Sequence, residues 1–270
     1  MDVKTVRDRV IADFLMPSRL DAYEGLLRHA LDHGYAIVPI EHYWDAIDHG
    51  AVGAGQRYLL LRHDIDTDPG TAGMMWQIEH DLGVRGSFYF RLSTLDIGLM
   101  QAIASQGGEA SYHYEELATV AKARHPRTTA AAEALLPEAR ELFASNLARL
   151  RAMTGLAMSV VASHGDFLNR RLDVKNTTIL ADPAFRASVG ITLETYDEAF
   201  LETVTSYHRD LLYPGQWMHG DPVAAIERGE PVVYLLIHPR SWRADRMGNL
   251  RDDIARIRED LVYRIPRRAR

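Results

Sequence analysis

The apolar run at Arg57–Ile65, with the sequence RYLLLRHDI, constrains the fold of this chain more than any other segment. Glycines precede the run and Asp-Pro-Gly follows it, so residues that favour turns bound it on both sides. A short apolar run without polar alternation predicts a strand that is buried on both faces. Helices cover both faces of a parallel sheet in α/β proteins, so this run favours that fold class.

Segments of the same kind alternate with helical segments along the chain. Strands are expected at 35–40, 85–92, 109–113, 159–163 and 231–237, and helices at 18–34, 69–83, 128–154 and 250–262. The segment 172–213 shows no clear periodicity, although 189–193 is a candidate strand. Strands that alternate with helices predict parallel β/α units.

The 270 residues contain no linker and no internal repeat. One α/β barrel commonly occupies a chain of this length, so we predict a single domain over residues 1–270. Residues 1–56 are expected to form an N-terminal extension, with helices and a short strand packed on the barrel.

Composition excludes several classes of protein. The chain carries 31 Lys and Arg against 37 Asp and Glu, a net charge of −6, so no broad basic field predicts a nucleic-acid partner. The longest apolar run falls far short of the roughly 20 residues that a membrane span needs, and the N-terminus does not resemble a signal peptide. We therefore expect a cytoplasmic protein without a membrane span. The C-terminal tail is basic, and a solvated tail or an anionic partner would account for it.

Four of the expected strands end in residues that can perform chemistry. These residues are Asp64 and Asp66 after the first main strand, His113 after the third, His164 after the fourth and His238 after the last. Active sites of parallel barrels lie at the carboxyl ends of the strands. We therefore expect these five side chains to lie at one edge of the sheet.

Alternation along a strand places Arg62, Asp64 and Asp66 on one face, with His63 on the other. Two carboxylates on one face repel each other unless a cation or a shared proton neutralises them, so a metal site is the first hypothesis. The chain has no cysteine, which limits the ligands to His, Asp and Glu. Arg62 is expected to orient or neutralise the two aspartates, and a purely structural ion pair is the alternative.

At these residues the sequence resembles the polysaccharide deacetylase (NodB homology) superfamily, carbohydrate esterase family 4 in the broad sense. It is most similar to a divergent intracellular branch of that superfamily. The matching segments, in family order from about residue 20 to 242, are HALDHGYAIVP, LLLRHDIDTDP, IEHDLGVRGSFYFR, GGEASYHYEEL and VVYLLIHPRSW. The LRHDID and LLIHP segments are the most specific of these.

The resemblance implies a distorted (β/α)7 barrel and hydrolysis of a linear amide bond in an N-acylated amino sugar. It assigns Asp64 as general base, Asp66 and His113 as metal ligands and His238 as general acid. The implied cofactor is a divalent metal: zinc is the first expectation, with cobalt, nickel or manganese as alternatives. A metal ion can polarise the amide carbonyl and lower the pKa of water, while a histidine can protonate the leaving nitrogen.

Two departures from the family pattern concern the metal site. The family has H-x-x-x-H after the third strand, but here Leu117 occupies the second histidine position. The family's R-x-P-Y motif after the fourth strand is replaced by Ser-His-Gly-Asp at 163–166. We predict that His164 supplies the third ligand, with Glu116 and Glu109 as alternatives and a metal-free site as another.

Substrate contacts are expected from Arg62 and from Trp242, an aromatic side chain that could stack against a sugar. Further candidates for a sugar site, each with an equally weighted structural interpretation, are Tyr196, His208, Asp210 and Trp217. The predicted function is metal-dependent removal of an acetyl or other small acyl group from an amino sugar or glycan precursor. Metal-independent amide hydrolysis of the allantoinase type and an inactive barrel that binds a glycan or a protein are the alternatives.

Overall fold

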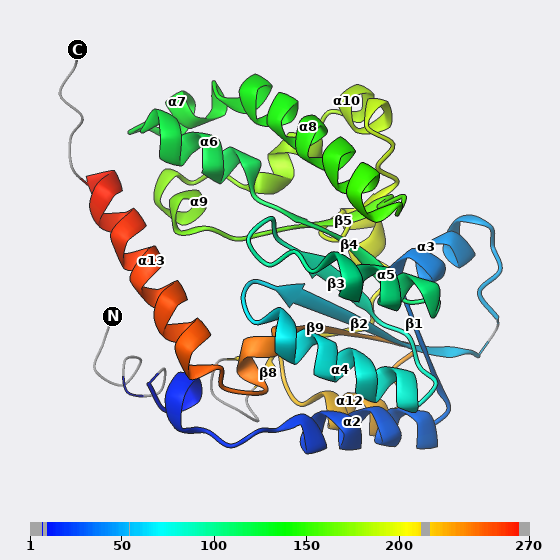
Figure 1. Cartoon of the computed structure of the whole chain (residues 1–270). Coiled ribbons are helices and arrows are strands. Elements are labelled where there is room, and N and C mark those ends of the chain that lie inside the picture. The colour runs from blue at the N-terminus through cyan, green and yellow to red at the C-terminus, as the bar shows by residue number, and fades with distance from the viewer. Residues whose placement is uncertain (1–6, 8–9, 54, 212–216, 265–270) are drawn as a thin grey trace, which may run out of the picture.

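A computed structural model describes residues 7, 10–53, 55–211 and 217–264 of the chain (Figure 1). The described residues form an α/β fold around one curled sheet of nine strands. The strands are β1 (Tyr35–Val38), β2 (Arg57–Ile65), β3 (Ser87–Phe90), β4 (Glu109–Tyr114), β5 (Val160–Ser163), β6 (Leu193–Glu194), β7 (Ser206–Asp210), β8 (Trp217–Met218) and β9 (Val232–Ile237). The last arginines of the basic tail, at 267–270, lie outside the described residues.

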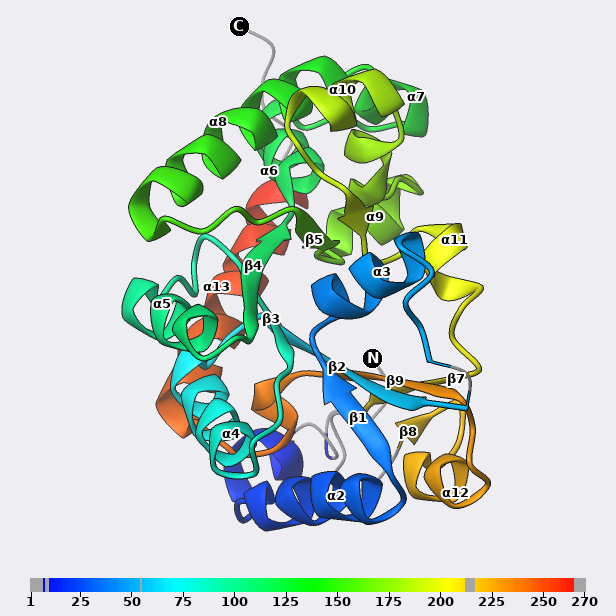
Figure 2. The ribbon, with the colours of Figure 1, turned by 90° about the vertical axis from the view of Figure 1, so that its right-hand side faces the viewer.

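Helices flank the sheet (Figures 1 and 2). The α-helices are α2 (Leu20–Asp32), α3 (Ile40–Asp48), α4 (Pro69–Asp81), α5 (Ile97–Ser105), α6 (Glu116–Arg124), α7 (Thr129–Glu133), α8 (Leu136–Thr154), α9 (Phe167–Leu172), α10 (Pro183–Ser188), α11 (Glu198–Leu201), α12 (Pro222–Glu227) and α13 (Arg246–Arg264). Shorter turns of other helix types are η1 (Ile11–Leu15), η2 (Asn176–Leu180) and η3 (Pro239–Ser241).

The predicted strand at Arg57–Ile65 is confirmed as β2, the centre of the sheet. The order is β6-β5-β4-β3-β2-β9-β7-β8, and all pairs are parallel except β7 with the short β8. Strand β1 pairs with the first half of β2 and β3 with its second half, both on the edge opposite β9. The path ends at β6 and β8, so the sheet is an open, curled barrel over the described residues.

The inner face of the curl is filled partly by α3, which follows β1 and lies across the concave side of the sheet (Figure 2). Ile40 and Tyr43 of this helix pack with Leu60, Tyr89 and Tyr234 from three strands. The backbone N–H of Ile40 donates to Ser87 Oγ at 2.8 Å, which ties the helix to the start of β3. The N-terminal segment is therefore integrated in the sheet and its core.

The elements that the sequence pattern missed lie where amphipathic periodicity is weak. Helix α6 was not expected, and it is buried on several sides, so its apolar residues do not form a single stripe. Strands β6 and β7 lie in the segment without clear periodicity, and 189–193 overlaps β6 only at its last residue. Helix α5 is capped by Asp96, whose side chain accepts from the Leu99 N–H.

No helix in the described part of the chain combines the length and the apolar character that crossing a membrane requires.

Candidate active site

The carboxyl end of β2 carries an ion pair between Arg62 and Asp64. The guanidinium donates to both carboxylate oxygens, from Nε to Oδ1 at 2.7 Å and from Nη2 to Oδ2 at 2.8 Å. Burial alone would raise the pKa of Asp64, but the charges of Arg62, His113 and His238 hold it below its ordinary value. Asp64 therefore remains an ionised carboxylate near neutral pH.

Asp66 follows β2 in the loop that leads to α4. Asp68, two residues later, has a left-handed backbone and caps α4 by accepting from the Thr71 N–H at 2.9 Å. Arg91, after β3, donates to the Asp66 carbonyl oxygen at 3.1 Å. These contacts fix the loop, so the Asp66 carboxylate is positioned independently of Asp64 and its arginine.

Two histidines reach the same place from β4 and from the end of β5. His113 Nδ1 lies 3.0 Å from the Ala162 carbonyl oxygen, so this nitrogen carries the proton and Nε2 presents its lone pair to the site. The His164 N–H donates to the Tyr114 carbonyl at 2.7 Å, and Asn176 donates to the His164 carbonyl at 2.6 Å. Backbone contacts thus hold both imidazoles before any ligand binds.

Asp66, His113 and His164 form a candidate metal centre. Asp66 Oδ1 lies 3.2 Å from His113 Nε2 and 2.8 Å from His164 Nδ1, and the three ligand atoms all lie within 4.8 Å of one another. Asp66 Oδ1 is buried, and no hydrogen bond of acceptable geometry reaches it within the described residues. A buried carboxylate oxygen beside two imidazole nitrogens fits a divalent cation such as zinc, which takes nitrogen and oxygen ligands in open three-ligand sites.

The electrostatics of the cluster agree with that fit. Burial would raise the pKa of Asp66, but His164 and His113 hold it well below its ordinary value. The carboxylate is therefore negative and ready to bind a cation across the physiological range. The structure brings together the three residues that the sequence predicts as metal ligands, Asp66, His113 and His164.

The alternative ligands are engaged elsewhere. Leu117 is buried in the hydrophobic core. The Glu116 carboxylate accepts from Tyr112, from Asn146 at 2.9 Å and from the Glu115 N–H. These contacts, and not the metal cluster, engage its oxygens. Glu109 begins β4, at the opposite end of the strand from His113, and burial raises its pKa to about 7. Both glutamates therefore act as structural hydrogen-bond acceptors here.

His238 lies just after β9 and is held by Asp210, the last residue of β7. His238 Nδ1 lies 2.7 Å from Asp210 Oδ1, and the His238 N–H donates to Oδ2 at 2.8 Å. Burial would lower the pKa of His238, but Asp210, Asp66 and Asp64 raise it to about 9. The imidazole is thus held protonated at neutral pH, as a general acid requires.

Two expected substrate contacts are not favoured by this structure. Arg62 is fully buried, and its guanidinium is occupied by Asp64 and Tyr234, so it orients the base and does not face a ligand. Trp242 is 4 % exposed, and its ring packs against Tyr23 and Trp217. Its indole N–H donates to Asp210 Oδ2 at 3.1 Å, so it supports the histidine's partner and leaves little ring surface for a sugar.

Among the further candidates, His208 and Trp217 have structural contacts. His208 Nδ1 lies 2.9 Å from the Gly220 carbonyl oxygen, and Nε2 lies 2.8 Å from Ser206 Oγ. The role of Asp210 as the partner of His238 was missed by sequence reasoning. The pattern that could have indicated Asp210 is an acidic residue at the carboxyl end of a strand, the same criterion that selected Asp64. It was not applied because β7 was not recognised as a strand.

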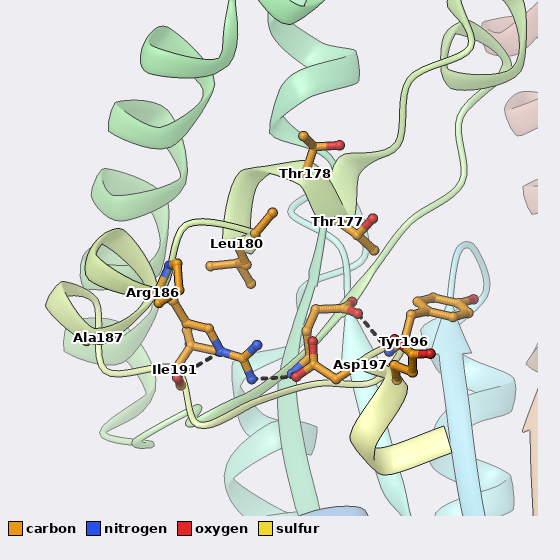
Figure 3. Close-up of a pocket in the computed structure, with 12 residues that line it drawn as sticks. Thr177, Thr178, Leu180, Arg186, Ala187, Ile191, Tyr196 and Asp197 are labelled. Carbon is orange, nitrogen blue, oxygen red and sulfur yellow. Dashed lines mark hydrogen bonds and ion pairs between the residues drawn. The ribbon is translucent and has the colours of Figure 1, made fainter. Parts of the chain in front are cut away.

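Tyr196 connects the site to an open pocket of about 640 Å³ (Figure 3). The Arg62 guanidinium carbon lies 4.5 Å from the centre of the Tyr196 ring, and the side chain is 41 % exposed. Figure 3 shows Tyr196 on one side of the pocket and Ile191 on the other, with Arg186 paired to Asp197 between them. The lining hydroxyls and carboxylates, with one aromatic face, are suited to a hydroxyl-rich ligand.

A second cleft, also of about 640 Å³, lies between the carboxyl edge of the sheet and α13. His164 and Gly165 line it beside the candidate metal centre, and the Lys122 in its lining is paired with Asp166 and Glu259. Its outer wall includes Ile257 and Leu261 of α13. The cleft thus reaches His164 of the candidate site, and its α13 wall combines Ile257 and Leu261 with charged residues such as Asp252 and Glu259.

Comparison with known proteins gives two similar solved structures. No protein-family model and no curated protein matches the chain. The deacetylase PplD of Streptococcus pyogenes, in complex with acetate, matches with a TM-score of 0.42 and 12 % identity over 70 % of this chain and 75 % of that chain. The peptidoglycan deacetylase PdaC of Bacillus subtilis matches with a TM-score of 0.39 and 12 % identity over 78 % and 87 %. These values are too low to assign a family, and the function below rests on the side chains of the site.

Proposed function

We propose that this chain is a metal-dependent amide hydrolase that removes an acetyl or other small acyl group from an amino sugar or glycan precursor. The observation that carries the proposal is the convergence of Asp66, His113 and His164, with ligand atoms within 4.8 Å of one another, at the strand edge that also bears Asp64 and His238. The resemblance of the motifs to the polysaccharide deacetylase superfamily supports the substrate class. We also propose that the open sheet is a variant of that superfamily's distorted (β/α)7 barrel.

Asp66, His113 and His164 would hold the cation. A divalent ion bound there would supply positive charge that polarises the amide carbonyl and favours loss of a proton from water. Asp64 is the base that takes this proton, since it is ionised and its Oδ2 lies 3.5 Å from His113 Nε2. Arg62 keeps both carboxylate oxygens of Asp64 in place but lowers their basicity. Asp64 can therefore take a proton only from a water whose own pKa is lowered.

His238 supplies the second proton transfer. An amine leaves readily from the tetrahedral intermediate only after its nitrogen is protonated, and a protonated imidazole can donate to it. Asp210 accepts from Nδ1, so Nε2 is the atom that faces outward with a proton. Trp242 holds the second oxygen of Asp210, so the aspartate keeps its orientation when the proton leaves His238.

Metal analysis of the purified protein tests this proposal. We expect stoichiometric divalent metal and release of acetate from N-acetylated amino sugars, both lost on treatment with a chelator and restored by zinc or cobalt. His164→Ala should lose the metal, whereas His49→Ala, which removes an exposed histidine in α3's C-terminal turn, should keep it.

Each other outcome contradicts a named part of the proposal. Metal retained by His164→Ala would remove this residue as a necessary ligand. Acetate release that is indifferent to chelation would favour metal-independent hydrolysis. Absence of both metal and activity over a broad panel of N-acylated sugars would favour the inactive binding barrel.

A further inference from the structure

Helix α13 (Arg246–Arg264) carries an exposed apolar stripe that the catalytic proposal does not use. Met247, Leu250, Ile254, Ile257 and Leu261 are 59, 44, 57, 61 and 57 % exposed. Their spacing of three and four residues places all five on one side of the helix. A contiguous row of large exposed apolar side chains is unusual on a soluble protein and marks a surface that contacts something else.

The charges of α13 are sorted between its two sides. Its carboxylates turn toward the body of the protein, where Asp252 and Asp253 pair with Arg240 at 2.9 and 3.1 Å and Glu259 pairs with Lys122 at 2.8 Å. The outward half carries arginines instead. Arg246, Arg251 and Arg258 flank the apolar stripe, are exposed, and make no ion pair with any residue that the structure describes.

The position of this face relates it to the candidate site. In Figure 1, β2 points toward the side of the molecule along which α13 runs. Ile257 and Leu261 belong both to the stripe and to the wall of the cleft that reaches His164. Phe14, from the N-terminal segment, and Phe167, at the start of α9, extend the apolar wall. Apolar side chains therefore continue from the outer face of α13 into the cleft that reaches His164, among the charged residues that also line it.

We propose that α13 docks this protein on an anionic lipid surface, with the mouth of its site facing that surface. A helix with an apolar stripe flanked by arginines lies in the interface of a membrane, with its apolar side chains among the acyl chains and its arginines at the phosphates. A second copy of this chain is a poorer occupant, because its face carries the same unpaired arginines and would repel the first. The charge pattern thus favours lipid over self-association.

This surface also narrows the substrate class, on the condition that the proposed hydrolase function is correct. A cleft that opens beside the apolar stripe, with both apolar and charged side chains in its lining, fits an N-acylated amino sugar attached to a lipid. The sugar amide would reach the candidate centre beside His164, while the lipid would lie along Ile257, Leu261 and Phe14.

Flotation with lipid vesicles tests the docking without any reference to catalysis. The protein should bind vesicles that contain phosphatidylglycerol in phosphatidylcholine, bind phosphatidylcholine alone much less, and dissociate at high salt. Arg258→Glu should lower the partition coefficient at least about fivefold, equivalent to about 1 kcal/mol per basic residue at such a surface. Ile254→Gln should lower it about tenfold, because the side chain no longer gains from leaving water.

Two variants in α8 provide matched controls. Arg149→Glu makes the same charge change at an exposed position, and Met153→Gln removes a 46 % exposed apolar side chain. Both should bind vesicles as the wild type does. Equal losses in the control variants, or no binding to anionic vesicles at all, would overturn the proposal. A wild-type dimer that Ile254→Gln converts to a monomer would assign the stripe to self-association instead.

The catalytic arm compares one N-acetylated amino sugar in soluble form and attached to a vesicle-borne lipid. Arg258→Glu should leave the rate on the soluble sugar unchanged and lower the rate on the vesicle substrate. Vesicle binding without hydrolysis of either substrate would refute the proposed function and leave the docking intact. If the wild type and every variant hydrolyse the soluble sugar faster than the vesicle-borne sugar, the lipid-linked substrate class is refuted and the docking is not.

Discussion

Asp64 is buried and His238 is partly buried, and their neighbours shift their pKa values in opposite directions. Arg62 holds Asp64 ionised, and Asp210 holds His238 protonated. Under the proposed function, the base and the acid therefore coexist in their active forms at neutral pH. A pH–rate profile is expected to reflect these two partners more than the intrinsic chemistry of the two side chains.

The Asp64→Asn variant tests the base directly. The amide keeps the size of the side chain and one acceptor oxygen but cannot take a proton, so turnover should fall by roughly 10²- to 10⁴-fold. Metal content should stay unchanged, because Asp66, His113 and His164 are intact. Acetate release and metal analysis on the same sample measure both effects. An unaffected rate would refute the assignment of Asp64 as base.

The Asp210→Asn variant tests the acid. Without the aspartate charge, the pKa of His238 should fall from about 9 toward its ordinary value of 6.5, measured by NMR titration of the imidazole in metal-free protein. The pair stabilises the fold fully below pH 6.5, and this contribution is lost as the pH rises through about 9. The variant should lose that stability and move the alkaline limb of the rate profile to lower pH. A His238 pKa that stays near 9 would contradict this account.

At the level of single residues, the sequence was sufficient to predict the location of side chains that strand position determines. Asp66, His113 and His164 were predicted because carboxyl ends of parallel strands meet at one edge, and a side chain needs no further information to arrive there. For Trp242, the pattern places an aromatic near the site but does not say that Tyr23 and Trp217 pack against its ring.

At the level of elements, β3 and α4 come unusually close at Gly86. A Cβ added at this glycine would lie 2.6 Å from Glu79 Oε2 and 3.2 Å from His63 Cε1. Both neighbours are buried, and Glu79 Oε1 also accepts from Tyr23 at 2.5 Å, so neither side chain can move freely. The glycine is therefore required for the approach of the helix to the sheet.

Gly86→Ala should accordingly lower the free energy of unfolding by roughly 1–3 kcal/mol, measured by urea denaturation. Gly25→Ala is the matched control, because a Cβ there meets nothing within 4 Å. Gly25 lies inside α2, so alanine should stabilise this helix by up to about 1 kcal/mol. Equal stability of the two variants would show that the contact at Gly86 relaxes without cost.

The elements that the sequence predicted are those with a strong period or a sharp boundary. Strand β2 was predicted to its end residues because a continuous apolar run stands between turn residues. Strand β7 was missed because its residues, Ser-Tyr-His-Arg-Asp, are mostly polar and its burial comes from pairing with β9 and from contacts far away in sequence. Such tertiary burial leaves no local signal.

At the level of the whole molecule, Arg240 joins three distant parts of the chain. It follows β9 and binds both oxygens of Asp13, from Nε and Nη2 at 2.8 Å each, within the N-terminal segment. It also pairs with Asp252 and Asp253 of α13. Asp13 is 1 % exposed and Arg240 is 8 % exposed, so this network is shielded from water and from salt.

Loss of this arginine should therefore release α13 and the N-terminal segment together. Arg240→Gln removes the cation that contacts both oxygens of the buried Asp13, and breaking a buried pair from one side costs about 3–5 kcal/mol. Hydrogen exchange should become faster in residues 11–15 and 246–264, while β2 and β9 keep their protection, because the sheet has its own core. Arg264→Gln, which breaks only the exposed pair with Asp260, should leave both segments protected. Faster exchange in α13 alone would mean that the N-terminal segment is held by other contacts, and uniform loss of protection would mean that Arg240 supports the barrel itself.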